Sequence, residues 1–341
     1  MDSRTYVRRR IEETTPEMAW QPGSKSEMQE WQIRLRNRLS MLVGLPTGKD
    51  WPLSSFVDRV EQMRGYRREM IRFESRPGLE VFAYFLVPDN CPSGQPAVLC
   101  LPGHGRGVDS IVGIAEDGSQ RDMDSPAEYQ ADFALQCVSQ GCCALAIEQV
   151  SFGRRRDEIA RNEGPEASSC HRDTAAAFML GESMVGWRVW DAIRAIDYLH
   201  SRTEVDPKRI ATMGISGGGV TSLWTACLDP RVAACIVSGY FNTFADSILS
   251  IHHCIDNYVP GLSGVVEMPD LAGLVAPRPL FVEGGDRDPI FPLHTLQKAI
   301  TQATEIYSAW GVPGRFGSEV FEGDHQFHGV GAFRFLKAAL P

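Results

Sequence analysis

The sequence lacks the features that place a protein in a membrane or on nucleic acid. It has no apolar run of about 18 residues, the minimum for a membrane-spanning helix, and no apolar segment follows the basic N-terminus MDSRTYVRRR. Lys and Arg are in deficit, 34 against 43 Asp and Glu, and the net charge of −9 would repel a phosphate backbone. We therefore expect a cytoplasmic protein that binds neither nucleic acid nor membranes.

Paired cysteine motifs are also missing. The nine cysteines form no CxxC pair, and several lie in apolar stretches such as AVLCLPG and GCCALAIE, where reduced buried thiols are more typical than disulfides. His252, His253 and Cys254 stand together, but no second cluster of zinc ligands follows at the usual spacing. We therefore expect no metal site and no cofactor.

The chain of 341 residues, 43% of them apolar, is long enough to bury a full core. Ser24 and Glu27 form a capping-box pattern, and apolar residues then recur at helical spacing as far as Leu42. We therefore predict an N-terminal helical extension over residues 1–65, packed on a main domain over residues 66–341.

The main domain alternates between strand and helix patterns. This alternation predicts a doubly wound, mostly parallel sheet of eight strands with helices on both faces. In such sheets ligands bind at the carboxyl ends of the strands, so we expect the functional residues in the loops there. Helices are expected over residues 127–140, 182–200 and 217–228, and two insertions near residues 150–180 and 242–271 interrupt the pattern.

The stretch GISGG, Gly214 to Gly218, fits the pattern G-x-S-x-G between a predicted strand and a predicted helix. In that context the serine occupies a sharp turn, its neighbours must be small, and its hydroxyl projects above the sheet. Ser216 is therefore the candidate nucleophile. A glycine-rich packing turn is the alternative, whereas the segment matches neither of the common phosphate-loop patterns.

A serine hydroxyl needs a base to remove its proton and an acid to orient that base. Both should follow the nucleophile, the acid first, each after a later strand. Asp288 follows the strand PLFVEGG, with Asp286 and Glu283 as competitors, and His325 follows GSEVFEG, with His328 three residues later. We favour Asp288, because a carboxylate followed by proline starts a rigid turn at a strand end. We favour His325, because a loop reaches the nucleophile more readily than a helix does.

Ester hydrolysis also requires N–H donors for the oxyanion of the tetrahedral intermediate. The backbone N–H of Gly217 is one candidate. The loop LPGHGRG should supply the other from Arg106 or Gly105, because its glycines let the backbone approach a ligand closely. His104 of the same loop is a candidate substrate-binding residue or a bridge between loops.

The second insertion holds two more candidate substrate-binding residues, His253 and Tyr258, in a segment that could form a wall of the pocket. The first insertion contains SFGRRRDEIARNEG, with Arg154, Arg155, Arg156 and Arg161. These arginines could attract an anionic substrate, and a solvated charged face is the alternative.

Together these motifs resemble the α/β-hydrolase superfamily, in particular its dienelactone-hydrolase and acetyl-xylan-esterase-like branch. The resemblance rests on HG after the third strand, GISGGG at the turn, APRPLFVEGGDRDPIFP and GDHQF, and it covers about residues 66 to 340. It implies Ser216 as nucleophile, Asp288 as acid, His325 as base, and backbone donors at Gly217 and Arg106. Dienelactone hydrolases proper use a cysteine nucleophile, and here the chain departs from them.

The residues and the resemblance predict a serine carboxylesterase that acts on a small or medium ester, such as an acetylated sugar, through an acyl-enzyme intermediate. A peptidase or amidase of the prolyl-oligopeptidase type is the alternative among hydrolases. A non-catalytic binding module is the alternative outside them. The expected partner is a small-molecule ester, and the sequence leaves open whether the protein forms a homo-oligomer.

Overall fold

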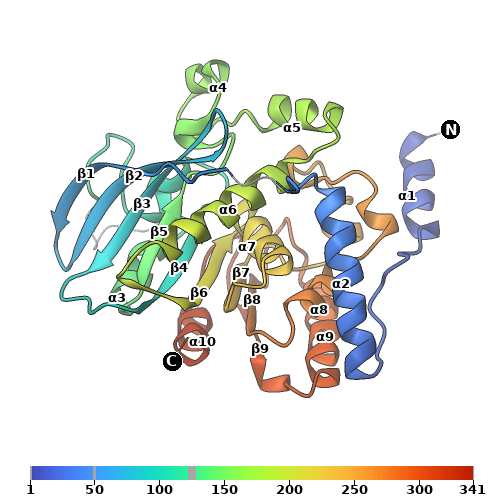
Figure 1. The fold of residues 1–341 in the computed structure, drawn as a ribbon. Helices are drawn as coiled ribbons and strands as arrows, with labels where there is room; N and C mark the ends of the chain where they lie inside the picture. Colours follow the sequence, from blue (N-terminus) through green and yellow to red (C-terminus); the bar gives the residue numbers. More distant parts are fainter. Residues whose placement is uncertain (1, 49–50, 122–127, 341) are drawn as a thin grey trace.

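The computed structural model describes residues 2–48, 51–121 and 128–340, and these residues form one large sheet with helices on both faces (Figure 1). The strand order is β1-β2-β3-β5-β4-β6-β7-β8-β9. The strands are β1 (Phe56–Met63), β2 (Tyr66–Arg76), β3 (Leu79–Pro88), β4 (Gln95–Leu101), β5 (Cys143–Ile147), β6 (Val205–Ile215), β7 (Ala234–Ser238), β8 (Leu280–Gly285) and β9 (Phe316–Phe321).

The described part of the sheet has nine strands, one more than the sequence predicts. The additional strand, β1, pairs antiparallel with β2 at the edge of the sheet. Its sequence FVDRVEQM is mostly exposed, so it lacks the buried face that marks a strand in a sequence. β1 lies within residues 1–65, so the sheet begins inside the segment that we assigned to the extension.

The five pairings from β5 through β4, β6, β7 and β8 to β9 are parallel, and the three pairings on the other side are antiparallel. The main α-helices are α1 (Ser3–Glu13), α2 (Lys25–Leu42), α3 (Phe133–Ser139), α4 (Glu158–Glu163), α5 (Cys170–Met179), α6 (Met184–His200), α7 (Gly217–Leu228), α8 (Leu271–Val275), α9 (Leu293–Ala309) and α10 (Val330–Ala339). Across residues 2–48, 51–121 and 128–340, no helix has the length and apolar character required to cross a bilayer.

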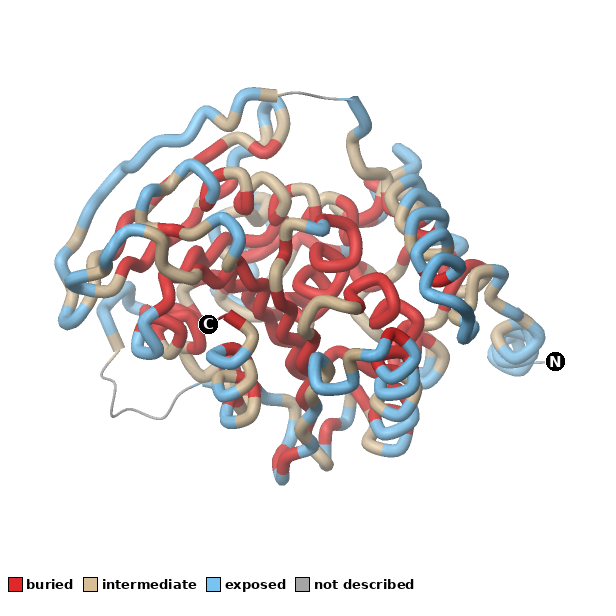
Figure 2. The backbone as a smooth tube through the Cα atoms, turned by 60° about the horizontal axis from the view of Figure 1, so that its bottom comes forward, coloured by how far each residue is buried: buried red, intermediate tan, exposed pale blue. Residues whose placement is uncertain are grey.

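Alternate residues of each central strand face different layers of the core. In β4, Ala97, Leu99 and Leu101 belong to the core layer that holds the buried residues of α6 and α7, whereas Val98 and Cys100 belong to the layer that holds those of α3. A strand buried on both faces needs apolar residues at every position, as AVLCL has. Figure 2 shows the resulting buried band through the middle of the molecule.

Helix boundaries agree with the sequence where a local cap sets them. α2 begins after Ser24, whose side chain forms the predicted capping box with Glu27. α3 differs, because it begins only at Phe133 rather than near residue 127, which lies outside the described residues. Ala131 and Asp132 have φ angles of 53° and 47°, a left-handed conformation that cannot continue a right-handed helix backwards.

The predicted helix of the N-terminal segment, α2, is held against the sheet domain by apolar and polar contacts. Leu35 and Leu39 are fully buried in the main core. The side-chain amide of Gln32 donates to the carbonyl oxygens of Gly273 and Ala276, both at 2.6 Å. These contacts cover the end of α8, so α2 contributes to the same core as the sheet.

We predict that Leu35→Ala lowers the free energy of unfolding by about 2–5 kcal/mol, because it leaves a cavity in a fully buried site. Ile33→Ala on the same helix is the control. Ile33 is 59% exposed, and its loss should change stability by no more than about 0.5 kcal/mol. Urea denaturation followed by circular dichroism measures both, and equal effects would contradict the docking of α2.

Candidate active site

Ser216 lies on a strained turn between β6 and α7. Its backbone has φ 55° and ψ −120°, a conformation that is costly for any residue with a side chain. A side chain on Gly214 would collide with the carbonyl of Gly218, and one on Gly218 would collide with the carbonyl of Leu101. The glycines of GISGG are therefore required by the close approach of strand and helix, as the sequence predicts.

His325 and Asp288 form a close pair. His325 Nδ1 lies 2.7 Å from Asp288 Oδ2, and the Asp288 side chain is almost fully buried. The other carboxylate oxygen accepts the backbone N–H groups of Ile290 and Phe291 at 2.8 and 3.1 Å. Since a carboxylate accepts, the proton sits on Nδ1 and leaves a lone pair on Nε2. That Nε2 is buried and has no hydrogen-bond partner within the described residues.

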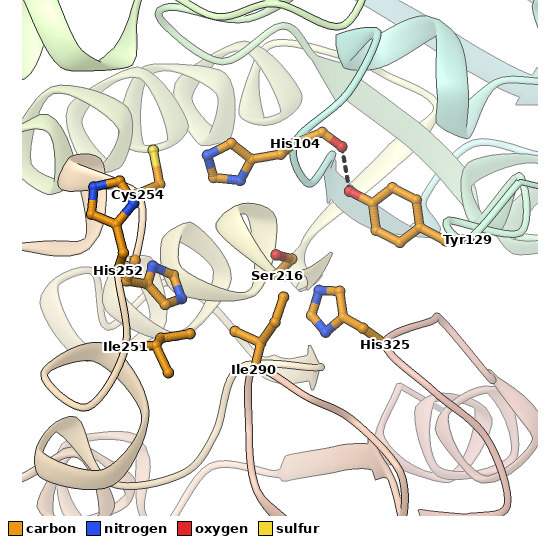
Figure 3. Close-up of a pocket in the computed structure, with 9 residues that line it drawn as sticks. His104, Tyr129, Ser216, Ile251, His252, Cys254, Ile290 and His325 are labelled. Carbon is orange, nitrogen blue, oxygen red and sulfur yellow. Dashed lines mark hydrogen bonds between the residues drawn. The ribbon is translucent and has the colours of Figure 1, made fainter.

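Two aromatic rings hold the His325 imidazole in place. Tyr129 and Phe291 stack on it with ring centroids 6.0 and 5.7 Å away and interplanar angles of 24° and 23°. Ser216 and His325 line the same cavity, and Figure 3 shows the serine hydroxyl and the imidazole at its centre. The fold therefore brings a hydroxyl, an imidazole and a buried carboxylate to one place.

The competing residues are engaged elsewhere. Asp286 accepts the backbone N–H of Gly323 at 2.9 Å, which ties the loop after β8 to the loop after β9. Glu283 is buried and accepts the backbone N–H of His328 at 2.9 Å. The His328 ring lies 3.2 Å from Glu319. Of these candidates, Asp288 and His325 are the acid and imidazole that meet.

The cavity beside Ser216 has a volume of about 420 Å³. It includes two of the predicted substrate-binding residues, His104 and His253. The third, Tyr258, does not line it, and its hydroxyl instead donates to the carbonyl of Ile248 at 3.0 Å. Other lining residues come from three separate segments: Tyr129 precedes α3, Ile290 follows β8, and Ile251 lies in the second insertion, so only the tertiary fold brings them together. The lining residues are His104, Tyr129, Ser216, Ile251, His252, His253, Cys254, Ile290 and His325.

His253 presents a neutral imidazole to the cavity. Burial lowers its pKa, so the uncharged form is favoured. Both ring nitrogens are buried without a hydrogen-bond partner in the described part of the chain, and the ring packs edge-on against Phe291 at 5.8 Å. A neutral imidazole offers one donor and one acceptor to a polar ligand.

Residues 1–309 match the Abhydrolase family. The chain belongs to this family. It is 28% identical to "Putative hydrolase YtaP" of Bacillus subtilis (strain 168) over 282 residues, 81% of this chain and 88% of that protein. The α/β-hydrolase fold predicted from the sequence is confirmed.

Two solved structures share the fold of this abhydrolase. A "putative acetyl xylan esterase" from Bacteroides fragilis NCTC 9343 superposes with a TM-score of 0.78 at 22% identity, covering 94% of this chain and 82% of that chain. A glucuronoyl esterase from Solibacter usitatus superposes with a TM-score of 0.68 at 15% identity, covering 95% and 96%. At these identities the likeness concerns the fold alone.

The predicted oxyanion donors of the abhydrolase lie at the same end of the sheet. Gly217 is the first residue of α7, so its N–H has no partner within the helix. The loop LPGHGRG approaches the nucleophile at Gly103, where an added Cβ would lie 3.3 Å from Ser216 Cβ. His104 lines the cavity, whereas Gly105 and Arg106 do not, so the second donor stays a prediction.

The arginines of the first insertion tie loops together. Arg154 pairs with Asp109 at 2.8 Å, and Arg155 pairs with Asp191 at 2.6 Å. Arg156 and Arg161 donate to backbone carbonyl oxygens of the same insertion. None of the four lines the cavity beside Ser216.

Glu148, just after β5, joins the segments that follow β4 and β5. It is fully buried and accepts the backbone N–H groups of Val108 at 2.9 Å and Arg154 at 3.2 Å. A side chain on Gly107 or Gly153 would collide with it. Burial raises the pKa of Glu148 from its ordinary 4.5 to about 7.

A raised pKa in the folded state means that this carboxyl stabilises the fold less as the pH rises from about 4.5 through 7. Glu148→Gln cannot ionise. We predict that the difference in free energy of unfolding between Glu148→Gln and the parent protein grows by about 2–3 kcal/mol, in favour of the variant, as the pH rises from about 5 to 8. Urea denaturation at a series of pH values measures the difference. A difference that stays constant with pH would contradict the buried-carboxyl assignment.

Proposed function

We propose that this abhydrolase is a serine hydrolase of carboxylic esters. The observation that carries the proposal is the close pair of His325 and Asp288, in which His325 Nε2 has no partner among the described residues and the His325 side chain lines the same cavity as Ser216. An activated serine needs this arrangement of nucleophile, base and orienting acid. The names of the two structural neighbours, an acetyl xylan esterase and a glucuronoyl esterase, support ester substrates over amides.

The proposed reaction begins when His325 Nε2 takes the proton of the Ser216 hydroxyl as its oxygen attacks the ester carbonyl. The buried Asp288 carboxylate stabilises the imidazolium that forms. The N–H of Gly217, and a second N–H from the loop LPGHGRG, stabilise the oxyanion. Collapse of the intermediate expels the alcohol, which takes the proton from His325 and leaves an acyl-serine.

Deacylation repeats these steps with water. His325 Nε2 removes a proton from water as the water oxygen attacks the acyl-serine carbonyl. The second tetrahedral intermediate collapses, the carboxylic acid leaves, and the proton returns to the Ser216 oxygen. No cofactor is needed to balance the reaction.

A carbohydrate ester is the substrate class that we propose. A cavity of about 420 Å³ has room for a small acyl group and part of a sugar ring. His253 supports this choice, because its neutral ring lacks partners among the described residues and can hydrogen-bond a sugar hydroxyl. Ile251 and Ile290 supply apolar surface for the acyl group.

We also propose that the protein works in a reducing compartment such as the cytoplasm. All nine cysteines lie in the described residues and are free thiols. Proteins of oxidising compartments usually pair such cysteines as disulfides. The arrangement therefore supports the compartment expected from the sequence.

The test of ester hydrolysis is a fluorophosphonate probe combined with a panel of p-nitrophenyl esters, acetylated sugars and aminoacyl anilides. We expect the probe to label Ser216, and acetate esters to be cleaved while anilides are not. Ser216→Ala should abolish labelling and lower kcat by about 10⁶-fold, the loss seen when a triad serine is removed. Anilide cleavage would favour an amidase, and an unlabelled Ser216 would favour a binding module.

The role of Asp288 has a matched control two residues away. We predict that Asp288→Asn lowers kcat for p-nitrophenyl acetate by about 10⁴-fold, because the amide no longer holds the productive tautomer of His325. Asp286→Asn keeps an oxygen that can accept the Gly323 N–H and should lose less than about tenfold. Equal losses in the two variants would contradict the assignment of Asp288.

A further inference from the structure

A cluster of four metal-ligating side chains lies beside the cavity and takes no part in the proposed ester chemistry. One ligand atom from each of His104, Cys170, Cys254 and Asp256 lies within 4.8 Å of every other. Three segments far apart in the sequence supply them: the loop after β4, the start of α5, and the stretch around residues 251–257. We propose that these four side chains bind a zinc ion.

Two of the six distances between the ligand atoms match the edges of a tetrahedral zinc site, and all six are within 4.8 Å. With zinc bonds of about 2.0–2.3 Å, the edges of the tetrahedron are about 3.3–3.8 Å long. His104 Nε2 lies 3.2 Å from Asp256 Oδ2, and Cys170 Sγ lies 3.3 Å from the same oxygen. A set of two sulfurs, one imidazole and one carboxylate favours zinc over magnesium or calcium, which prefer oxygen ligands alone.

A buried ring nitrogen without a hydrogen-bond partner also indicates a ligand at this cluster. His104 Nε2 is buried and makes no well-formed hydrogen bond to the described residues, although Asp256 Oδ2 lies close to it. A buried ring nitrogen without a partner costs free energy. A metal ion between the two atoms would use the lone pair of the nitrogen and one of the carboxylate.

The charges around the cluster balance with a divalent ion in place. Two thiolates and one carboxylate carry three negative charges. Zinc supplies two positive charges, and the buried guanidinium of Arg188 supplies the third, with Nη1 2.6 Å from Asp256 Oδ2 and Nη2 3.3 Å from Cys170 Sγ. The thiol protons leave to solvent when the ion binds. Hydrogen bonds of this kind from outer groups orient metal ligands.

A four-ligand site without an open position is structural rather than catalytic. His104 and Cys254 line the cavity, so zinc would clamp its wall across three segments. It would also hold the His104 ring over Gly217, where an added Cβ would lie 3.2 Å from His104 Nδ1. The sequence predicts no metal site, because no two of the cysteines show ligand spacing and the ligands meet only in the folded chain.

We propose no metal ion at a second group of possible ligands, formed by Glu283, Glu319 and His328. Glu283 accepts the backbone N–H groups of His328 and Gly329 and the hydroxyl of Ser238. Its oxygens are therefore already satisfied within the protein. Because this second group contains no cysteine, cobalt bound there would give no thiolate-to-cobalt charge-transfer band, which distinguishes it from the cysteine-containing cluster.

The test is a cobalt titration of the full chain, reduced and stripped of metal by a chelator. We expect a thiolate-to-cobalt charge-transfer band and the visible bands of tetrahedral cobalt, saturating at one ion per chain and displaced by one equivalent of zinc. Cys170→Ser and Cys254→Ser should each weaken cobalt binding by about tenfold or more and reduce the charge-transfer band. Cys91→Ser is the control, since Cys91 lies outside the cluster, against Cys143.

The parent protein alone can overturn the proposal, so the result does not depend on how the variants fold. Absence of the charge-transfer band in fully reduced protein would overturn it, as would cobalt binding that lacks the band. A disulfide between Cys170 and Cys254 that resists reduction, found by mass spectrometry, would also overturn it. None of these outcomes bears on ester hydrolysis, which the Ser216→Ala experiment tests separately.

Discussion

The close approach of α7 to the end of β6 is the constraint on which the rest of this protein depends. It leaves space for glycine alone at Gly214 and Gly218, and it forces Ser216 into a conformation with positive φ. The turn therefore costs free energy, which the surrounding sheet and helix must supply. In return it presents one hydroxyl at the carboxyl edge of the sheet and one free N–H, that of Gly217, directly beside it.

The remaining members of the site follow from the order of the strands. β6, β7, β8 and β9 are neighbours and parallel, so their following loops meet at one edge. The loops after β8 and β9 are joined by backbone hydrogen bonds, including Arg287 N–H to Gly323 O at 3.0 Å. These hydrogen bonds between the two loops keep Asp288 and His325 close together. The flanking rings of Tyr129 and Phe291 limit rotation of the imidazole.

The opposite wall of the cavity has a different physical basis. It is built from loops and short helices rather than strands, and a buried ionic cluster around Arg188 and Asp256 joins them. Burial raises the pKa of Asp256, but the charge of the Arg188 guanidinium and the hydrogen bonds that this carboxylate accepts outweigh burial and leave that pKa well below its ordinary range. Arg188 also lies over the ring of Phe152, 4.2 Å from its centroid. Such an arrangement holds three distant segments in one position, with or without an ion at its centre.

The sequence by itself determined what depends on neighbours in the chain. Local spacing and steric rules account for four features: the capping box of α2, the bounds of α7, the apolar residues on both faces of β4, and the turn at Ser216. It also indicated Asp288 and His325, because each follows a recognisable strand. Tertiary structure alone decided that Glu283 and His328 stay apart from the nucleophile, that β1 joins the sheet with little burial, and that Tyr258 lies outside the cavity. It also decided that His104, Cys170, Cys254 and Asp256 converge. The reason is that these outcomes depend on contacts between segments far apart in the sequence, and no local pattern of residues encodes such contacts.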